Sequence, residues 1–157
     1  MDWGRLFFSP EGRIRRQDFW MTFAILFGAT LLLGWFPPFW LVIFYCCVVT
    51  RAKRLHDMGR SGWFQVMPAV AYTIALVMSI YYAVGTVFTG VNMDHLNQPA
   101  AIGGIVLGAL TLGFVWFTAV LVDIGFLLWI GCSEGEPEDN RFGPPPVSPA
   151  ASYVARA

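Results

Sequence analysis

The feature that most constrains this fold is a long stretch without charge, because no Asp, Glu, Lys or Arg occurs from Phe19 to Thr50. A single membrane-spanning helix needs about 20 residues, so this stretch is too long for one. Two prolines in GWFPPFW, residues 34–40, interrupt it, and proline breaks the interior of a helix. The aromatic residues beside the prolines are typical of a membrane interface. The stretch therefore predicts two short helices, about 18–35 and 38–54, joined by a tight turn.

Two further apolar stretches follow, at about 63–84 and 101–131, with a polar, glycine-containing loop at 85–99 between them. Of all residues, 57% are hydrophobic and only 13% are charged, whereas a soluble domain carries about 25% charged residues. So few charges cannot cover the surface of a soluble globule. The sequence therefore predicts an all-α membrane protein with four transmembrane helices.

The distribution of the basic residues predicts the orientation of these helices. The two loops expected on the outer side, between the first and second and between the third and fourth helices, contain no Lys or Arg. Cytoplasmic loops carry the excess of basic residues in membrane proteins. We therefore expect both termini in the cytoplasm. The ten basic residues precede the first helix, separate the second from the third or follow the fourth: Arg5, Arg13, Arg15, Arg16, Arg51, Lys53, Arg54, Arg60, Arg141 and Arg156.

These boundaries divide the chain into a cytoplasmic N-terminal segment, 1–17, a four-helix transmembrane bundle, 18–131, and a proline-rich cytoplasmic tail, 132–157, expected to be disordered after about residue 146. The tail is acidic and the loop at 51–64 is basic. Because both are expected on one side of the membrane, their opposite charges predict that the tail folds back over the basic loop.

Three motifs at the cytoplasmic side carry a resemblance to a known family. They are GRIRRQDFW at 12–20, RAKRLHDMGRSGWF at 51–64, and G-x-P-x-x-N-R-F-G-P at 135–144. In order and spacing the chain resembles the family called domain of unknown function 805, over about residues 5–146. It departs at Glu138, where a glycine is common, and at Pro145, where an aspartate is common. The resemblance implies a four-helix protein of the bacterial inner membrane, and it implies no reaction.

We therefore expect a non-enzymatic accessory or scaffold protein whose cytoplasmic face binds anionic lipid headgroups or a membrane-protein partner. Each Lys or Arg near an anionic membrane contributes about 1 kcal/mol. Nucleic acid is not expected as a ligand, because the basic residues are few and lipid competes for them. The residues expected on this face are Arg13, Arg16, Arg51, Arg54, His56, Asp57, Arg60, Trp63, Asn140 and Arg141.

His56 and Asp57 admit a second interpretation, in which the pair catalyses acid–base chemistry on a lipid headgroup. Neighbouring residues on a helix point about 100° apart, which disfavours a catalytic pair. In the simpler interpretation Asp57 pairs with Arg54 or Arg60, or caps the loop. The three cysteines, Cys46, Cys47 and Cys132, form no C-x-x-C motif, so neither a metal site nor a cofactor is predicted.

Asp123 is the one acidic residue inside an apolar stretch. A carboxylate within a bilayer is costly, so its side chain is expected to face the bundle or water. A small transporter or ion-conducting oligomer that uses Asp123 is therefore the alternative function; the simpler interpretation is a structural hydrogen bond. In the same stretch, small residues at four-residue spacing predict close helix packing or homo-oligomerisation: Gly104, Gly108, Ala109 and Gly113.

Overall fold

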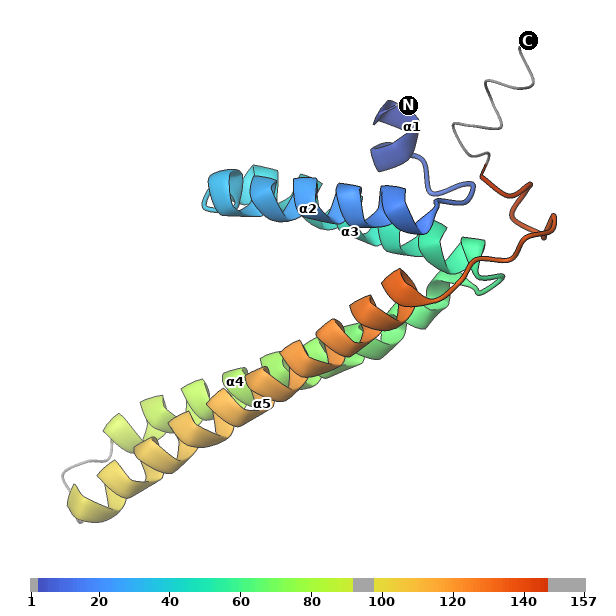
Figure 1. Cartoon of the computed structure of the whole chain (residues 1–157). Helices are drawn as coiled ribbons and strands as arrows, with labels where there is room; N and C mark the ends of the chain where they lie inside the picture. Colours follow the sequence, from blue (N-terminus) through green and yellow to red (C-terminus); the bar gives the residue numbers. More distant parts are fainter. Residues whose placement is uncertain (1–2, 92–97, 147–157) are drawn as a thin grey trace, which may run out of the picture. The chain divides into compact units, whose positions relative to one another are not determined.

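A computed structural model describes residues 3–91 and 98–146 of the chain, and every regular element in these residues is a helix (Figure 1). The elements are α1 (Trp3–Phe8), α2 (Arg16–Leu33), α3 (Pro37–Asp57), the 3-10 helix η1 (Gly62–Gln65), α4 (Val66–Val91) and α5 (Gln98–Cys132). Each of the four predicted long helices is present. The expected disorder after residue 146 lies outside the described residues.

Two helix boundaries differ from the prediction in an informative way. α3 continues to Asp57, beyond the expected end near residue 54, so His56 and Asp57 also belong to the helix. α4 continues to Val91, beyond the expected end near residue 84, because 85–91 contains neither charge nor proline and the helix retains its backbone hydrogen bonds. α1 was not predicted, since six residues are too few for a periodic pattern.

The turn between α2 and α3 forms as the prolines require. Pro37 and Pro38 occupy the first turn of α3, where a missing N–H costs nothing because that donor has no partner within the helix. At the end of α2, Gly34 donates its backbone N–H to the carbonyl of Thr30 at 2.9 Å. A Cβ at Gly34 would collide with that same carbonyl. The glycine and the prolines therefore end one helix and begin the next within three residues.

The chain divides into two compact units, residues 1–65 with 127–157 and residues 66–126, and each is described by itself. In the first unit, α2 and α3 pack around a small core of Leu26, Ile43 and Cys46. α1 lies against α3, because the Tyr45 hydroxyl donates to the Phe8 carbonyl at 3.0 Å and Lys53 Nζ donates to the Leu6 carbonyl at 3.2 Å.

In the second unit, α4 runs beside α5 (Figure 1). Trp116 Nε1 donates to Ser79 Oγ at 3.0 Å, and the Trp116 ring lies 6.2 Å from that of Tyr72. Gly108 is buried, and a Cβ there would come within 3.1 Å of the Tyr82 ring. A small residue at 108 therefore permits the two helices to approach.

Two segments are long and apolar enough to cross a membrane, Gly62–Phe88 and Ile102–Cys132. In the most apolar window of each, only 6% and 11% of the residues are buried, whereas the core helix of a soluble protein is mostly buried. Their exposed side chains are largely Leu, Ile, Val and Phe, which suit a lipid environment. α2 begins with Arg16, Gln17 and Asp18, and α3 ends in a polar turn, so both are less apolar than these two segments.

Candidate functional site

The end of α3 is fixed by a glycine. Gly59 adopts a positive φ of 66°, which favours glycine because it has no Cβ. Its backbone N–H donates to the His56 carbonyl at 3.1 Å, and the N–H of Arg60 donates to the Leu55 carbonyl at 2.8 Å. These two bonds form a Schellman motif, which satisfies the last carbonyls of the helix. The letters HDMGR therefore encode a helix end, and this end positions the residues around it.

Arg13 connects this helix end to both ends of the chain. Gly12, with a φ of 92°, turns the segment before α2 so that Arg13 faces α3. The Arg13 side chain is 1% exposed. It donates to Asp57 Oδ1 at 3.0 Å, to the Asp57 carbonyl at 3.3 Å, and to three carbonyls of the tail, those of Glu136, Glu138 and Gly143. A guanidinium has five N–H donors, so Arg13 binds with its full capacity.

Arg54 makes a second set of connections from inside α3. Its side chain is also 1% exposed. Nε donates to the Ile130 carbonyl at 2.8 Å, and the terminal nitrogens donate to the carbonyls of Ile14 and Ser133 and to Asp57 Oδ2. One buried guanidinium thus binds the segment before α2, the end of α5 and its own helix.

Asp57 lies between the two arginines and completes what we call the polar junction, defined as Arg13, Arg54 and Asp57. Its side chain is 6% exposed, and each carboxylate oxygen accepts from a different guanidinium. The predicted partner Arg54 is confirmed as one of these two, and Arg60 is not. Removing one member of a buried ion pair costs about 3–5 kcal/mol, because the remaining charge stays buried without compensation. The junction therefore holds three parts of the chain together.

The tail reaches the junction through the turn at 140–143. Asn140 and Gly143 exchange backbone hydrogen bonds, Asn140 Oδ1 accepts from the Phe142 N–H at 3.0 Å, and Gly143 has a φ of 120°. The Asn140 side-chain amide donates to the His56 carbonyl at 2.9 Å and to Glu136 Oε2 at 2.8 Å. The letters NRFG therefore encode a tight turn that docks on the end of α3.

The tail folds back on the basic segment as predicted, but by a different means. Among the described residues, no acidic side chain of the tail makes an ion pair with that segment. The tail instead offers backbone carbonyls to Arg13 and Arg54 and donates the Glu136 N–H to the Asp57 carbonyl at 2.8 Å. A Cβ at Gly135 would collide with the Asp57 carboxylate. Close approach of the backbone, rather than charge attraction, positions the tail.

A family model described as "Protein of unknown function (DUF805)" matches residues 34–144, a range that runs from the turn before α3 to the end of the docked tail. The chain belongs to this family. The match confirms the resemblance carried by the motifs. No curated protein and no solved structure matches the chain.

In this DUF805 chain, His56 has an environment separate from that of Asp57. Its ring stacks on Phe142 with centroids 3.9 Å apart and planes 7° apart, and its Nδ1 is buried without a hydrogen-bond partner among the described residues. Burial lowers the pKa of His56 below its ordinary value of 6.5. The charge of Arg141 lowers this pKa further, and the Gly12 backbone opposes both effects. His56 therefore packs the tail in its neutral form.

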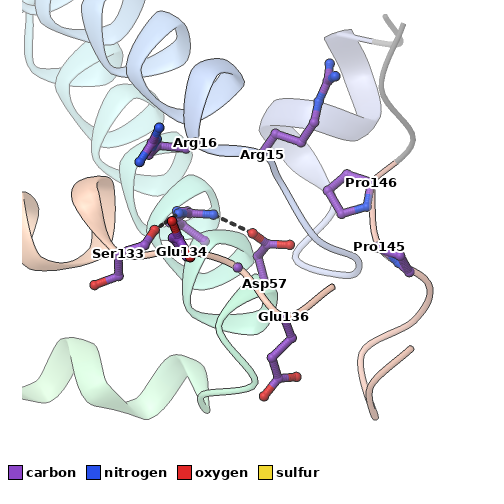
Figure 2. Close-up of a pocket in the computed structure, with 10 residues that line it drawn as sticks. Arg15, Arg16, Asp57, Ser133, Glu134, Glu136, Pro145 and Pro146 are labelled. Atoms are coloured by element: carbon purple, nitrogen blue, oxygen red, sulfur yellow. Dashed lines mark hydrogen bonds and ion pairs between the residues drawn. The ribbon is translucent and has the colours of Figure 1, made fainter. Parts of the chain in front are cut away.

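A cleft of about 290 Å³ lies beside the junction, between the start of α2 and the tail. It is lined by Arg15, Arg16, Arg54, Asp57, Ser133, Glu134, Gly135, Glu136, Pro145 and Pro146. Figure 2 shows Arg15 and Arg16 pointing in different directions from the start of α2. Arg15 pairs with Asp18 at 3.0 Å, while the exposed Arg16 donates to the Cys132 carbonyl at 3.5 Å. Positive and negative side chains balance in this cleft, so it favours no ligand charge.

The other residues predicted on this face divide by exposure. Arg51 is half-buried, while Arg60, Trp63 and Arg141 are exposed. Arg141 lies over the Phe142 ring at 4.7 Å. The predicted face is thus two sets of residues: Arg13, Arg54, His56, Asp57 and Asn140 connect parts of the chain, whereas Arg16, Arg60, Trp63 and Arg141 remain accessible.

The predicted residues of α5 belong to the second unit, whereas the polar junction belongs to the first. Asp123 is half-buried and lies one helical turn after Ala119, which is 2% exposed. Of the four small residues, Gly108 packs against Tyr82, while Gly104, Ala109 and Gly113 are exposed. The cleft beside the junction is lined by neither Asp123 nor His56.

Three contributors to the site were missed from the sequence: Trp20, Gly135 and Phe142. Trp20 Nε1 donates to the Gly131 carbonyl at 3.1 Å, and its ring fills the space where a Cβ at Gly131 would lie. Gly135 and Phe142 lie inside the tail motif. The tail motif was the sequence signal that could have indicated these two residues. Their individual roles depend on the contact between the tail and α3, which the sequence does not show.

Proposed function

We propose that this chain crosses the bacterial inner membrane four times with both ends in the cytoplasm, and that it serves as a non-enzymatic accessory or scaffold protein. The main observation that supports this proposal is that three helix ends meet at the polar junction. The start of α2, the end of α3 and the end of α5 are all bound there by Arg13, Arg54 or Trp20. Alternating spans require these ends to lie on one side of the membrane, and the basic residues gather at this side.

The rigid junction supports a scaffold role. Buried polar groups that are satisfied by hydrogen bonds specify one arrangement of the backbone. The junction therefore builds a fixed platform from the N-terminal segment, the end of α3 and the tail. The exposed residues of that platform, including Arg16 and Arg141, are available to headgroups or to a partner protein.

Two other functions receive less support from the geometry. An acid–base pair needs its members to cooperate, but Asp57 accepts from two arginines while His56 stacks on Phe142. Ion conduction through Asp123 needs a polar path, and the cleft beside Asp57 is not lined by Asp123.

Labelling of single cysteines in intact cells tests the topology. In a background with Cys46 and Cys47 replaced by alanine, the exposed Cys132 is expected to react with a membrane-impermeant maleimide only after the cells are opened. A Trp35→Cys variant, which also carries Cys132→Ser, places the only thiol in the turn between α2 and α3. That variant is expected to react in intact cells. Equal labelling of both positions in intact cells would contradict four spans.

Affinity purification from membranes tests the scaffold role. A bound partner protein is expected to be lost from Asp57→Ala, which disrupts the platform, and retained by Asp18→Ala, which removes a carboxylate from the more exposed Arg15 pair. Each variant removes one negative charge, so the net charge of the two variants is the same. Partners and lipids that are identical for wild type and both variants would refute a role for the platform.

A further inference from the structure

Arg60 is held in a fixed position although it lies at the surface. It directly follows Gly59, and its backbone N–H completes the Schellman motif at the end of α3. On its other side, the Ser61 carbonyl accepts from the Phe64 N–H at 3.2 Å, and the Trp63 N–H donates to Ser61 Oγ at 3.4 Å. The backbone before and after Arg60 is therefore ordered.

The guanidinium of Arg60 is positioned by two aromatic rings rather than by a carboxylate. Its central carbon lies 5.5 Å from the centroid of Phe64 and 5.9 Å from that of Trp129. Among the described residues, its side chain makes no hydrogen bond and no ion pair, in contrast to Arg13 and Arg54. Cation–π contacts orient a guanidinium without using its N–H donors, so Arg60 presents these donors to its surroundings.

The two rings lie near the ends of the candidate spans, and Arg60 lies just before the first of these spans. Phe64 lies at the start of Gly62–Phe88, and Trp129 lies near the end of Ile102–Cys132. Their rings are 6.1 Å apart, which places the two span ends at one depth. Beside them, Trp63 is 80% exposed. Tryptophan is enriched at the level of lipid headgroups, so Arg60 lies where lipid phosphates are found.

We propose that Arg60, clamped by Phe64 and Trp129, binds the phosphate of an anionic phospholipid at the membrane surface. This site depends on the proposed membrane topology. It makes the proposed headgroup binding specific, because it assigns the binding to one residue and one class of lipid. A guanidinium with free donors forms two parallel hydrogen bonds to phosphate oxygens, a geometry that lysine does not match. The two rings reduce the conformational entropy that a flexible arginine loses when it binds.

Native mass spectrometry of the purified full chain in detergent micelles tests this site. Phosphatidylglycerol is titrated as the probe, with phosphatidylcholine as the uncharged reference. One arginine at an anionic surface is worth about a fivefold change in affinity. Arg60→Ala is expected to weaken the binding of phosphatidylglycerol about fivefold, and Arg60→Lys is expected to restore it in part. Trp129→Leu keeps the charge but removes a ring, and is expected to give a smaller loss.

Arg15→Gln is the matched control, because it removes the same charge from an arginine whose donors already bind Asp18. Equal losses in Arg15→Gln and Arg60→Ala would show only a general charge effect and would overturn the site. Competition by inorganic phosphate at millimolar concentration would assign the site to free phosphate instead of lipid, which also overturns the proposal. If Arg60→Ala binds like wild type while the cysteine labelling still gives four spans, this inference fails alone.

Discussion

The polar junction and the α4–α5 unit hold helices together in opposite ways. At the junction, two buried arginines that share the carboxylate of Asp57 donate to backbone carbonyls, and the partners of Arg13 include carbonyls more than 100 residues away in the sequence. Between α4 and α5, Trp116 donates one side-chain hydrogen bond to Ser79, and most large apolar side chains face outward. Hydrogen bonds specify one arrangement at the junction, whereas small residues and apolar packing suffice between α4 and α5.

Replacing Asp57 gives the largest expected effect and tests the junction side of this comparison. Asp57→Ala leaves two buried guanidiniums without their carboxylate, and is expected to lower the free energy of unfolding by about 3–5 kcal/mol. Chemical unfolding in mixed micelles measures the change. Hydrogen exchange at 135–143 is expected to rise as well, because the tail loses its anchor.

Two control variants show whether the large effect of Asp57→Ala is caused by the burial of the ion pair. Asp18 forms an i, i+3 pair with Arg15, as Asp57 does with Arg54, but the side chains of the Asp18 pair are 24% and 17% exposed. Asp18→Ala is expected to cost about 0–1 kcal/mol. Trp116→Phe, which removes the hydrogen bond from Trp116 to Ser79 between α4 and α5, is expected to cost about 0.6 kcal/mol. Costs as large as that of Asp57→Ala would erase the contrast between the two regions.

Protonation of His56 is expected to have a smaller effect on stability. It distinguishes the two regions, because among the described residues the histidine lies in the first unit, beside the polar junction. Burial lowers its folded pKa below 6.5, so the unfolded chain binds a proton first as the pH falls. The stability that neutral His56 contributes is complete above pH 6.5 and is lost as the pH drops through the lowered folded pKa. Protection factors at 140–143, corrected for intrinsic exchange, are expected to decrease from pH 7 to pH 5.

His56→Phe provides the control for this pH dependence. Phenylalanine keeps a ring against Phe142 but does not titrate. The protection factors of the variant are expected to stay constant between pH 7 and pH 5. If the protection factors of His56→Phe decrease as much as those of the wild type, the pH dependence arises from another group and not from His56.

The sequence predicted what depends on local pattern. The charge-free stretch and its prolines placed α2, α3 and their turn, and the sequence offered Arg54 as one of two candidate partners of Asp57. It did not predict the second partner of Asp57, because Arg13 lies 44 residues away and no periodicity connects the two segments. Nor did it predict the stacking of His56 on Phe142, since that contact exists only after the 140–143 turn has docked. The extension of α4 to Val91 was missed because glycine and threonine suggested a loop, although an apolar environment favours helix.

The choice of acceptors at the junction has a consequence for the order of assembly. A ribosome makes the chain from its N-terminus, so Arg13 and Arg54 are in place before most of their partners exist. Five of the carbonyls that they bind belong to residues 130–143. The acceptors of both guanidiniums are therefore complete only after residues 130–143 have been synthesised. A chain that stops before residue 130 lacks these acceptors.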